Sequence, residues 1–275
     1  MTDMDRNVAF DNSERQICVA QVIGTFRIAD GGGGAQRLAN HLAVGLSKLG
    51  IRSIAIALRV EGPVSESTTQ EVMFVPFGAN TRRPLTLLKA FVGLRALIRR
   101  QQIDLLHIHG ATSLPFVVLA TRMLRRAPRL VFTWQDSGSV LGQTGWRRKL
   151  MVWALRQCDA VSGSSRAVAQ ALQTRTGLDQ VGVFHGGVPI GPEPRIEVTS
   201  SPLIIWIGRI VPPKDPLILI RAAAALKNEG LDFKVYVIGE PHVSSAWYMN
   251  EARDLVEQLD VKDRVVLTGF MLDND

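Results

Sequence analysis

The sequence has few cysteines, no long apolar run and no export signal. Only two cysteines, Cys18 and Cys158, occur in 275 residues, and their wide separation predicts neither a disulfide framework nor a zinc site. The first 16 residues are acidic and polar, where a secretory signal needs a basic start followed by an apolar run. The apolar stretch at 85–98 is interrupted by two basic residues, so it is too short to cross a membrane. We therefore expect a globular protein in the cytoplasm, a reducing compartment.

Acidic residues are nearly missing between residues 82 and 156, which hold 14 lysines and arginines but only two aspartates. This segment carries +12 while the whole chain carries +7, so the remainder must be negative. Such an asymmetry indicates an anionic partner, either a membrane surface, a phosphate-bearing substrate or nucleic acid. The alternative is a set of ordinary solvated helix faces. Because no nucleic-acid-binding module is recognised, we expect no nucleic-acid partner.

Short β-branched runs alternate with helical patterns along most of the first two thirds of the chain. Strands are expected at 17–23, 51–58, 71–75, 103–107, 130–134, 160–162 and 181–184, and helices at 35–49, 85–100, 114–126, 146–157 and 167–175. Alternation of this kind predicts an α/β fold, in which helices cover both faces of a parallel sheet.

The pattern pauses at residues 186–202, which hold four prolines and three glycines, and then restarts. Strands are expected at 203–207, 233–238 and 265–268, and helices at 216–228 and 247–258. The predicted division is a tail at 1–16, a Rossmann-like domain at 17–185, a linker at 186–202 and a second Rossmann-like domain at 203–275. A doubly wound domain typically needs about 100 residues or more. We therefore expect the second domain to be incomplete, as in a truncated form of a longer protein.

A run of four glycines, which includes Gly33 and Gly34, lies between the first expected strand and the first expected helix. Glycines there let a ligand approach the backbone, and the free amide groups of a helix N-terminus favour an anion. The alternative is a flexible turn. The dinucleotide fingerprint G-x-G-x-x-G is not matched, because Gln36 stands at its last glycine. A nicotinamide cofactor is therefore not expected.

Gly208, Arg209 and Lys214 follow the first strand of the second domain and precede a helix. At the carboxyl end of a parallel strand, this spacing predicts two cations around one pocket, close to a helix N-terminus. Arginine offers a fork that matches phosphate oxygens, and lysine supplies a point charge, so the pair suits a diphosphate. Alternatively, Lys214 is solvated and Arg209 pairs with a nearby carboxylate.

The order of these motifs resembles the retaining nucleotide-sugar glycosyltransferases of family 4, which have the GT-B fold of two Rossmann-like domains. The resemblance runs from about residue 17 to the last residue. Its landmarks are the Gly-rich loop at 31–36, the strand with paired histidines at 104–110, the Thr-Trp-Gln-Asp step at 133–136, the segments at 159–172 and 185–188, and the stretches at 208–214 and 265–270.

The resemblance implies transfer of a hexosyl-type sugar from a nucleoside-diphosphate sugar to a hydroxyl acceptor, in polysaccharide, lipopolysaccharide or glycolipid synthesis. Arg209 and Lys214 would stabilise the diphosphate as its bond to the sugar breaks, and Gly33, Gly34 and Gly208 would also face the donor. The cleft between the two domains would then lie between these cations and the four-glycine turn. The nucleotide sugar is a co-substrate, and no cofactor or metal is expected.

The acceptor would lie on the first domain, beside His109, Gln135 and Asp136. Gln135 stands where the family usually has histidine, and a glutamine can hydrogen-bond a sugar hydroxyl but cannot titrate. For His107 and His109, two apart on one strand face, the alternative is a packed structural pair with one ring reaching the cleft.

Two further departures bear on activity. Gln36 stands where the family usually has glutamate, and the E-x7-E motif that holds the sugar and ribose in many members is absent. A second hypothesis is therefore a catalytically inactive remnant that only binds nucleotide or acceptor.

The basic segment predicts where such an enzyme works. Its cations would hold the first domain against anionic lipid at the inner face of the plasma membrane, where a lipid-linked acceptor resides. Tryptophans and other apolar residues are mixed with basic residues at 146–156, which suits an interfacial helix. The alternative is an ordinary amphipathic surface helix, which has the same composition.

Overall fold

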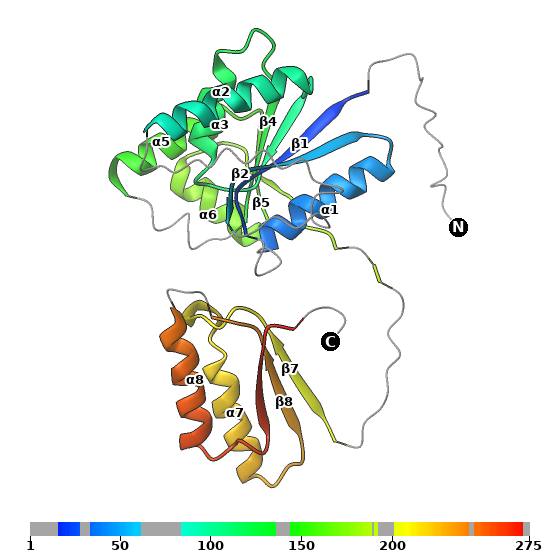
Figure 1. The fold of residues 1–275 in the computed structure, drawn as a ribbon. Helices are drawn as coiled ribbons and strands as arrows, with labels where there is room; N and C mark the ends of the chain where they lie inside the picture. The colour runs from blue at the N-terminus through cyan, green and yellow to red at the C-terminus, as the bar shows by residue number, and fades with distance from the viewer. Residues whose placement is uncertain are drawn as a thin grey trace, which may run out of the picture. The chain divides into compact units, whose positions relative to one another are not determined.

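The structure, a computed structural model, describes residues 16–27, 34–61, 84–135, 144–188, 190–191, 201–241 and 245–271. The chain divides into two compact units, Met1–Ile190 and Gly191–Asp275, called unit 1 and unit 2 below (Figure 1). Within the described ranges, none of the helices combines the length and the apolar character needed to cross a membrane.

Unit 1 contains a six-stranded sheet in which every pairing is parallel, in the order β2-β1-β3-β4-β5-β6. Its strands are β1 (Cys18–Arg27), β2 (Arg52–Glu61), β3 (Leu105–Ile108), β4 (Arg129–Trp134), β5 (Ala160–Gly163) and β6 (Gly182–Val183). Its helices are α1 (Gly34–Lys48), α2 (Pro84–Arg100), α3 (Leu114–Arg122), α5 (Gly145–Leu155) and α6 (Arg166–Thr176). The strand expected at 71–75 lies outside the described residues.

The two faces of the unit 1 sheet carry different helices because the chain reverses direction across it. From β1 the chain moves outward to β2, and it then returns past β1 to β3, so right-handed crossovers place α1 on one face and the later helices on the other. Figure 1 shows α1 on the opposite side of the sheet from α2 and α3. Ala39 of α1 packs with Ile23 and Ala57 on its face. The reversal also creates a switch point between β1 and β3, where ligands of such sheets bind.

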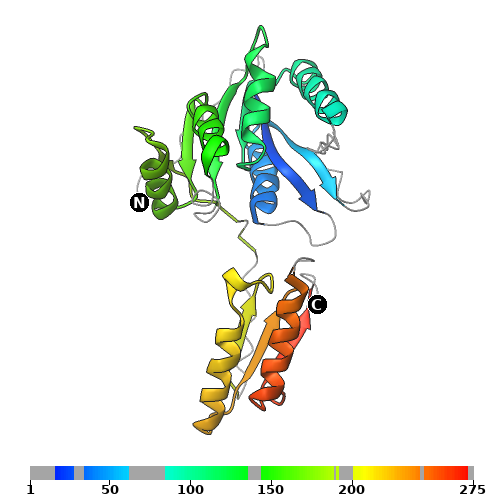
Figure 2. The same cartoon turned by 90° about the vertical axis from the view of Figure 1, so that its left-hand side faces the viewer.

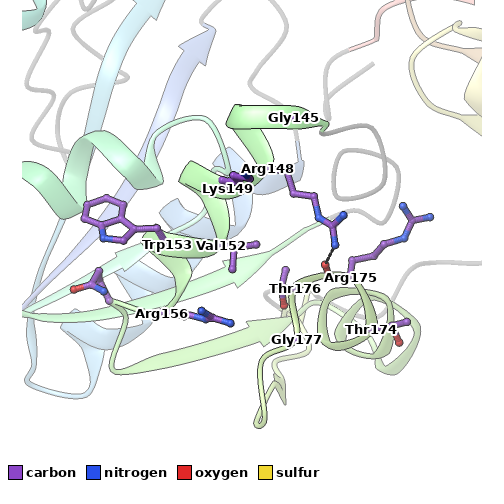
Figure 3. A pocket seen from close by; sticks show the side chains of 11 residues that line it. Gly145, Arg148, Lys149, Val152, Trp153, Arg156, Thr174, Arg175, Thr176 and Gly177 are labelled. Carbon is purple, nitrogen blue, oxygen red and sulfur yellow. Dashed lines mark hydrogen bonds between the residues drawn. The ribbon is translucent and has the colours of Figure 1, made fainter.

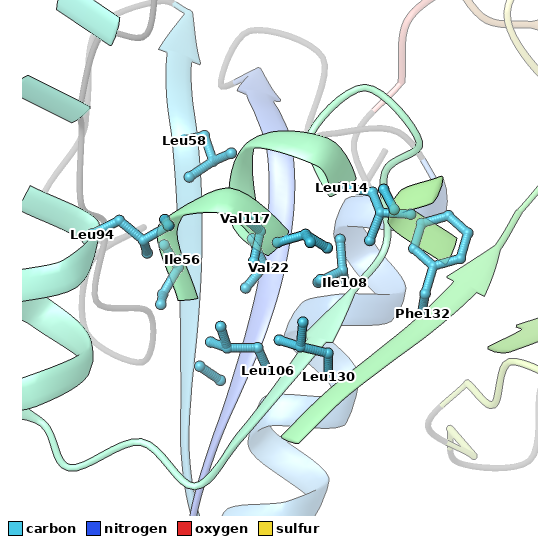
Figure 4. Packing of buried hydrophobic residues seen from close by; sticks show 14 of the residues in the cluster. Val22, Ile56, Leu58, Leu94, Leu106, Ile108, Leu114, Val117, Leu130 and Phe132 are labelled. Carbon is cyan, nitrogen blue, oxygen red and sulfur yellow. The ribbon is translucent and has the colours of Figure 1, made fainter. Parts of the chain in front are cut away.

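The main core of unit 1 lies under α2, α3, α5 and α6 (Figure 4). Strand residues of one parity, such as Val22, Ile108 and Phe132, pack against Leu94 of α2 and Val117 of α3, and all five are fully buried. Burying an aliphatic or aromatic side chain of this size contributes about 1.5–3 kcal/mol. This layer therefore fixes the strand ends that carry the polar residues of the other face.

Unit 2 contains a three-stranded parallel sheet, β7 (Leu203–Ile207), β8 (Lys234–Ile238) and β9 (Val265–Gly269), in that order. Its helices α7 (Leu217–Asn228) and α8 (Ala246–Gln258) lie on the same face of this sheet (Figure 2), as successive right-handed crossovers in one direction require. They pack on the inward residues of the strands, for example Val235 and Val237. On the other face Leu203, Ile205 and Ile207 are at least half exposed.

The sequence predicted one helix too long. The helix expected at 114–126 is α3, which ends at Arg122, and the chain then tightens so that the amide of Leu124 donates to Thr121 O at 3.0 Å. Arg122, Arg125 and Arg126 would be like-charged neighbours on a continued helix, and Ala127 precedes a proline, which disfavours helical backbone.

Candidate functional site

The carboxyl edge of the unit 1 sheet is closely packed around the switch point. Gly24 in β1 and Gly110 after β3 lie against each other: a Cβ on Gly110 would meet Ser113 Oγ at 3.2 Å and the Gly24 nitrogen at 3.5 Å. The Ser113 hydroxyl donates to Gly110 O at 2.7 Å. This edge therefore has a defined backbone shape with little side-chain bulk.

Gly34, the described end of the glycine run, stands at the start of α1. Gly34 is the first residue of the helix and is exposed, while Gly33 lies outside the described residues. The side-chain amide of Gln36 donates to Thr25 O, which ties the first turn of α1 to β1. Gln36, which replaces the last glycine of the dinucleotide fingerprint, therefore has a structural role in holding α1 to β1.

A buried chain of neutral polar groups runs from β1 through β3 toward β4. His109 Nε2 lies 2.8 Å from Gln21 Oε1, and its Nδ1 lies 3.4 Å from the amide nitrogen of Gln135. An amide oxygen can only accept, so Nε2 carries the proton and Nδ1 accepts from Gln135. His109 is 4% exposed and Gln21 is 1% exposed. Two of the three predicted acceptor-side residues, His109 and Gln135, are therefore in contact, while Asp136 lies outside the described residues.

A second chain of polar groups lies beside the first. His107 Nε2 is 2.8 Å from Thr133 Oγ1, which is 2.9 Å from Ser162 Oγ, so the contacts link β3, β4 and β5. The rings of His107 and His109 are 4.0 Å apart. The ring of Phe184, just after β6, meets His107 edge to face at 5.4 Å.

Burial keeps both imidazoles neutral. It lowers the pKa of His107 to about 4, and burial together with the neighbouring His107 lowers the pKa of His109 to about 2. Both rings are neutral near pH 7, and both nitrogens of His109 already have partners. The pair can hold neighbouring groups in place by hydrogen bonding, but His109 is a poor proton acceptor.

The chain leaving unit 1 crosses this polar face. Phe184 packs on the ring of His107. Two residues later, Gly186 lies so close to α1 that an added Cβ would meet Leu38 Cδ1 at 3.2 Å. His185 between them is exposed. The exit segment at 184–186 therefore contacts both the paired histidines and α1.

The carboxyl edge of the unit 2 sheet is built from three glycines, Gly208, Gly239 and Gly269. The amide of Gly208 donates to Ile238 O at 3.0 Å, and that of Gly239 donates to Gly269 O at 2.8 Å. Gly239 has a φ of 141°, and a Cβ there would lie 1.9 Å from Gly208 O. Only glycine fits this position. The three glycines, called the glycine shelf below, bring no side chain of their own to this edge, and the ring of Trp206 lies against Gly208.

Two cations follow the first glycine of the shelf in the chain. The side chains of Arg209 and Lys214 are both exposed, and within the described ranges neither side chain has a hydrogen-bond or ion-pair partner. Lys214 ends a short 3₁₀ turn, Pro212–Lys214, that is followed by Asp215 at φ 39°. The hydroxyl of Tyr248 on α8 donates to Asp215 Oδ1 at 2.9 Å and fixes this turn. Burial and the contact with Asp215 raise the pKa of Tyr248 to about 12, so it remains a donor.

Gly208, Arg209 and Lys214 thus share the carboxyl edge of unit 2, as the sequence indicates. The alternative in which Arg209 pairs with a carboxylate has no such pair among the described residues. The cleft expected between these cations and the four-glycine turn stays a prediction. No cluster of three or more metal-binding side chains occurs in the described part of the chain.

Several residues of these edges were not predicted. Gln21 lies inside an expected strand, and nothing in its sequence context marks it as a partner of His109. Gly239 had a usable signal, since each strand of unit 2 ends at a glycine in the sequence. Tyr248 could be found only from the fold, because it is 33 positions from Asp215.

The comparisons with known proteins give a family from one source and a fold from another. A family model described as Glycosyltransferase Family 4 matches residues 32–191. No curated protein sequence matches the chain.

Three solved structures illustrate the likeness of fold. HepE from Anabaena, in complex with UDP and glucose, has a TM-score of 0.69 at 17% identity, over 94% of this chain and 70% of its own. A glycosyltransferase from Rickettsia africae has a TM-score of 0.67 at 18% identity, over 94% and 70%. Sucrose-phosphate synthase from Thermosynechococcus elongatus has a TM-score of 0.71 at 16% identity, over 94% and 71%. The expected fold class, α/β with two Rossmann-like units of the GT-B type, is confirmed.

Proposed function

Because this chain belongs to glycosyltransferase family 4, we propose that it transfers a hexosyl-type sugar from a nucleoside-diphosphate sugar to a hydroxyl group, with retention of configuration. The acceptor is a saccharide or a lipid-linked sugar of cell-envelope polysaccharide, lipopolysaccharide or glycolipid synthesis. In the reaction the bond from the anomeric carbon to the phosphate oxygen breaks, and the acceptor oxygen bonds to that carbon. The nucleoside diphosphate leaves with the electron pair, and the hydroxyl proton is released.

The glycine shelf and its two cations carry this proposal. Glycine backbone at the carboxyl end of parallel strands lets a diphosphate approach closely, and the side chains of Arg209 and Lys214 form no ion pair among the described residues. Negative charge accumulates on the diphosphate as the sugar departs, so cations placed there stabilise the transition state more than the ground state. We assign the donor diphosphate to Gly208, Arg209 and Lys214, with Gly33 and Gly34 as donor-facing residues of unit 1.

The polar network of unit 1 suits an acceptor that is recognised by neutral hydrogen bonds. We assign the acceptor side to His109, Gln135 and Asp136. Gln135 cannot titrate, and the pKa of His109 is about 2 with both ring nitrogens engaged, so Gln135 would orient a hydroxyl while His109 holds that amide in place, and neither would take the proton. Asp136 is then the member of this set whose chemistry allows proton transfer.

The decisive experiment is a titration of the full chain with UDP, GDP and ADP by calorimetry, with Arg209→Ala and Arg221→Ala as matched variants. Arg221 is also exposed, and it lies on α7, beyond the turn that carries Lys214. Removing a charged hydrogen bond to a phosphate costs about 1.5–3 kcal/mol. The Arg209→Ala variant should therefore bind the preferred nucleotide roughly 10- to 100-fold more weakly, while the Arg221→Ala variant should match the parent.

A second measurement separates sugar transfer from binding alone. Donor hydrolysis and transfer to a set of saccharide and lipid-linked acceptors are followed with the same protein. Nucleotide binding that depends on Arg209 but gives no transfer would favour the inactive remnant. Equal binding by both arginine variants would overturn the donor-site assignment.

A further inference from the structure

The helices that cover the main core of unit 1 carry many basic residues and not one acidic residue. Their sequences hold Lys89, Arg95, Arg99 and Arg100 on α2, Arg122 on α3, Arg147, Arg148 and Lys149 on α5, and Arg166 and Arg175 on α6. Helices α1 and α7 also lack acidic residues but carry only two basic residues each, and α8 mixes both signs. The excess found in the sequence is therefore concentrated on one layer of one unit.

The outward side of α2 is apolar as well as basic. Leu85, Leu88 and Val92 are 73%, 60% and 56% exposed, and Lys89 and Arg99 lie on the same stripe. Their spacing follows the helical period, so they form one face, while Leu94 and Ile98 are buried on the other. Scattered exposed leucines are ordinary, but an aliphatic stripe flanked by cations is typical of helices that lie on membranes.

The same combination continues on the neighbouring helices. On α3, Leu119 and Met123, just after its end, are 48% and 74% exposed on either side of Arg122. On α5, Trp146 is 69% exposed, and the guanidinium of Arg147 lies 5.6 Å from the centre of its ring. Helix α3 packs against both α2 and α5. These outward residues are called the α2–α3–α5 face below.

A basic groove adjoins this face between α5 and the end of α6 (Figure 3). Its volume is about 780 Å³, and its lining includes Arg148, Lys149, Arg156 and Arg175 but no carboxylate. Arg148 donates to Arg175 O at 2.7 Å and so caps the end of α6. Lys149 and Arg156 are exposed and have no ion-pair partner among the described residues.

We propose that the α2–α3–α5 face binds the surface of an anionic lipid bilayer and that the groove beside α5 receives a phosphate headgroup. Cations without acidic neighbours complement anionic headgroups, and the exposed leucines, valine, methionine and tryptophan enter the interfacial region. Nucleic acid would satisfy the cations but would leave the aliphatic stripe of α2 in water, so the apolar part favours lipid. This inference does not depend on sugar transfer, because it concerns a different part of unit 1 from the carboxyl edge.

The α2–α3–α5 face lies near the predicted acceptor side. Helix α3 begins at Leu114, soon after His109, because the helix follows its strand at the carboxyl edge of the sheet. The α2–α3–α5 face therefore begins close to the predicted acceptor side, and a lipid-linked acceptor held in the same bilayer would be close to it.

The test is flotation of the full chain with phosphatidylcholine vesicles, either alone or mixed with phosphatidylglycerol. Two double variants are compared: Lys89→Glu with Arg99→Glu on the proposed face, and Arg221→Glu with Arg253→Glu on the helices of unit 2. Both have the same net charge, and all four side chains are exposed. Each basic residue near an anionic bilayer strengthens binding about fivefold, so the first variant should bind mixed vesicles at least about 25-fold more weakly, and the second should bind like the parent.

Two further variants test the groove and the apolar stripe. Lys149→Glu with Arg156→Glu should weaken binding to mixed vesicles as the α2 variant does. Leu88→Ser with Val92→Ser keeps every charge and, because both side chains are exposed, should keep the fold. It should leave only the salt-sensitive part of the binding, so high salt should then release the protein completely.

Three results would overturn the inference: equal flotation with neutral and mixed vesicles, equal losses in the two charge-matched variants, or binding of a duplex oligonucleotide without binding of mixed vesicles. The last of these would assign the face to nucleic acid.

Discussion

The carboxyl edges of the two parallel sheets are built in opposite ways. In unit 1 the edge is lined by buried neutral groups that are already bonded to one another, such as Gln21, His109 and Gln135. In unit 2 it consists of glycine backbone and two cations with no described partner. A satisfied buried network holds its shape and suits neutral ligand groups, whereas glycine backbone beside cations that form no ion pair suits an anion. The same fold thus offers two different kinds of binding surface.

This difference implies that unit 1 loses stability when its edge is disturbed, whereas most changes at the edge of unit 2 affect ligand binding first.

Acid should destabilise unit 1 more than unit 2. His107 and His109 have pKa values of about 4 and about 2 in the folded state, below the value of about 6.5 in an unfolded chain. Their contribution is complete above about pH 6.5 and is lost as the pH falls toward the folded values, because the unfolded state binds protons first. Between about pH 7.5 and pH 5 the loss should be about 2 kcal/mol for each histidine.

Hydrogen exchange measured peptide by peptide, with protection corrected for intrinsic rates, reports the two units separately. The only histidine of unit 2, His242, lies outside the described residues. His107→Gln should halve the pH slope of unit 1, and His185→Gln, at an exposed site, should leave it unchanged. Equal slopes for both units would contradict the contrast.

Gly239→Ala should unfold the edge of unit 2, which makes it the exception to the contrast. The new Cβ would lie 1.9 Å from Gly208 O, and the φ of 141° is unfavourable for alanine. We expect a loss of at least about 3 kcal/mol in the free energy of unfolding of unit 2, measured by urea denaturation. Gly45→Ala on α1, where a Cβ meets nothing within 4 Å, should be neutral or stabilising. A mild effect at Gly239 would show that the shelf can rearrange.

Tyr248→Phe should have the smallest effect on stability. It removes the hydrogen bond to Asp215, whose exposed carboxylate can turn to water, so the loss should be about 1 kcal/mol. Nucleotide affinity should fall more clearly than stability, because the turn that carries Lys214 is no longer fixed. The other tyrosine, Tyr236, has no such bond among the described residues, so Tyr236→Phe is the control, and an equal loss of affinity there would contradict the role of Tyr248.

Most of the fold could be predicted from the sequence, because periodicity and chain order determine it. The strand expected at 203–207 is β7 without change, and most other described elements differ by one to three residues at their ends. There are two larger differences. Helix α3 ends at Arg122, where like-charged arginines follow, and strand β1 extends to Arg27. Right-handed crossovers then fix which helix covers which face.

The candidate site could be predicted only in part. Gly208, Arg209 and Lys214 are close in sequence, so their shared edge follows from one strand end. The partners of His109 come from β1 and β4, and no local pattern reports a register between strands. Likewise, the neutrality of the two imidazoles follows from burial, which a single sequence does not show.

The exit segment at 184–186 has a mechanical consequence. Phe184 contacts the ring of His107, and Gly186 packs against Leu38 of α1. A change in the backbone at 184–186 would therefore disturb both of these places together. The end of unit 1 thus joins its buried polar network to the helix on the opposite side of that network.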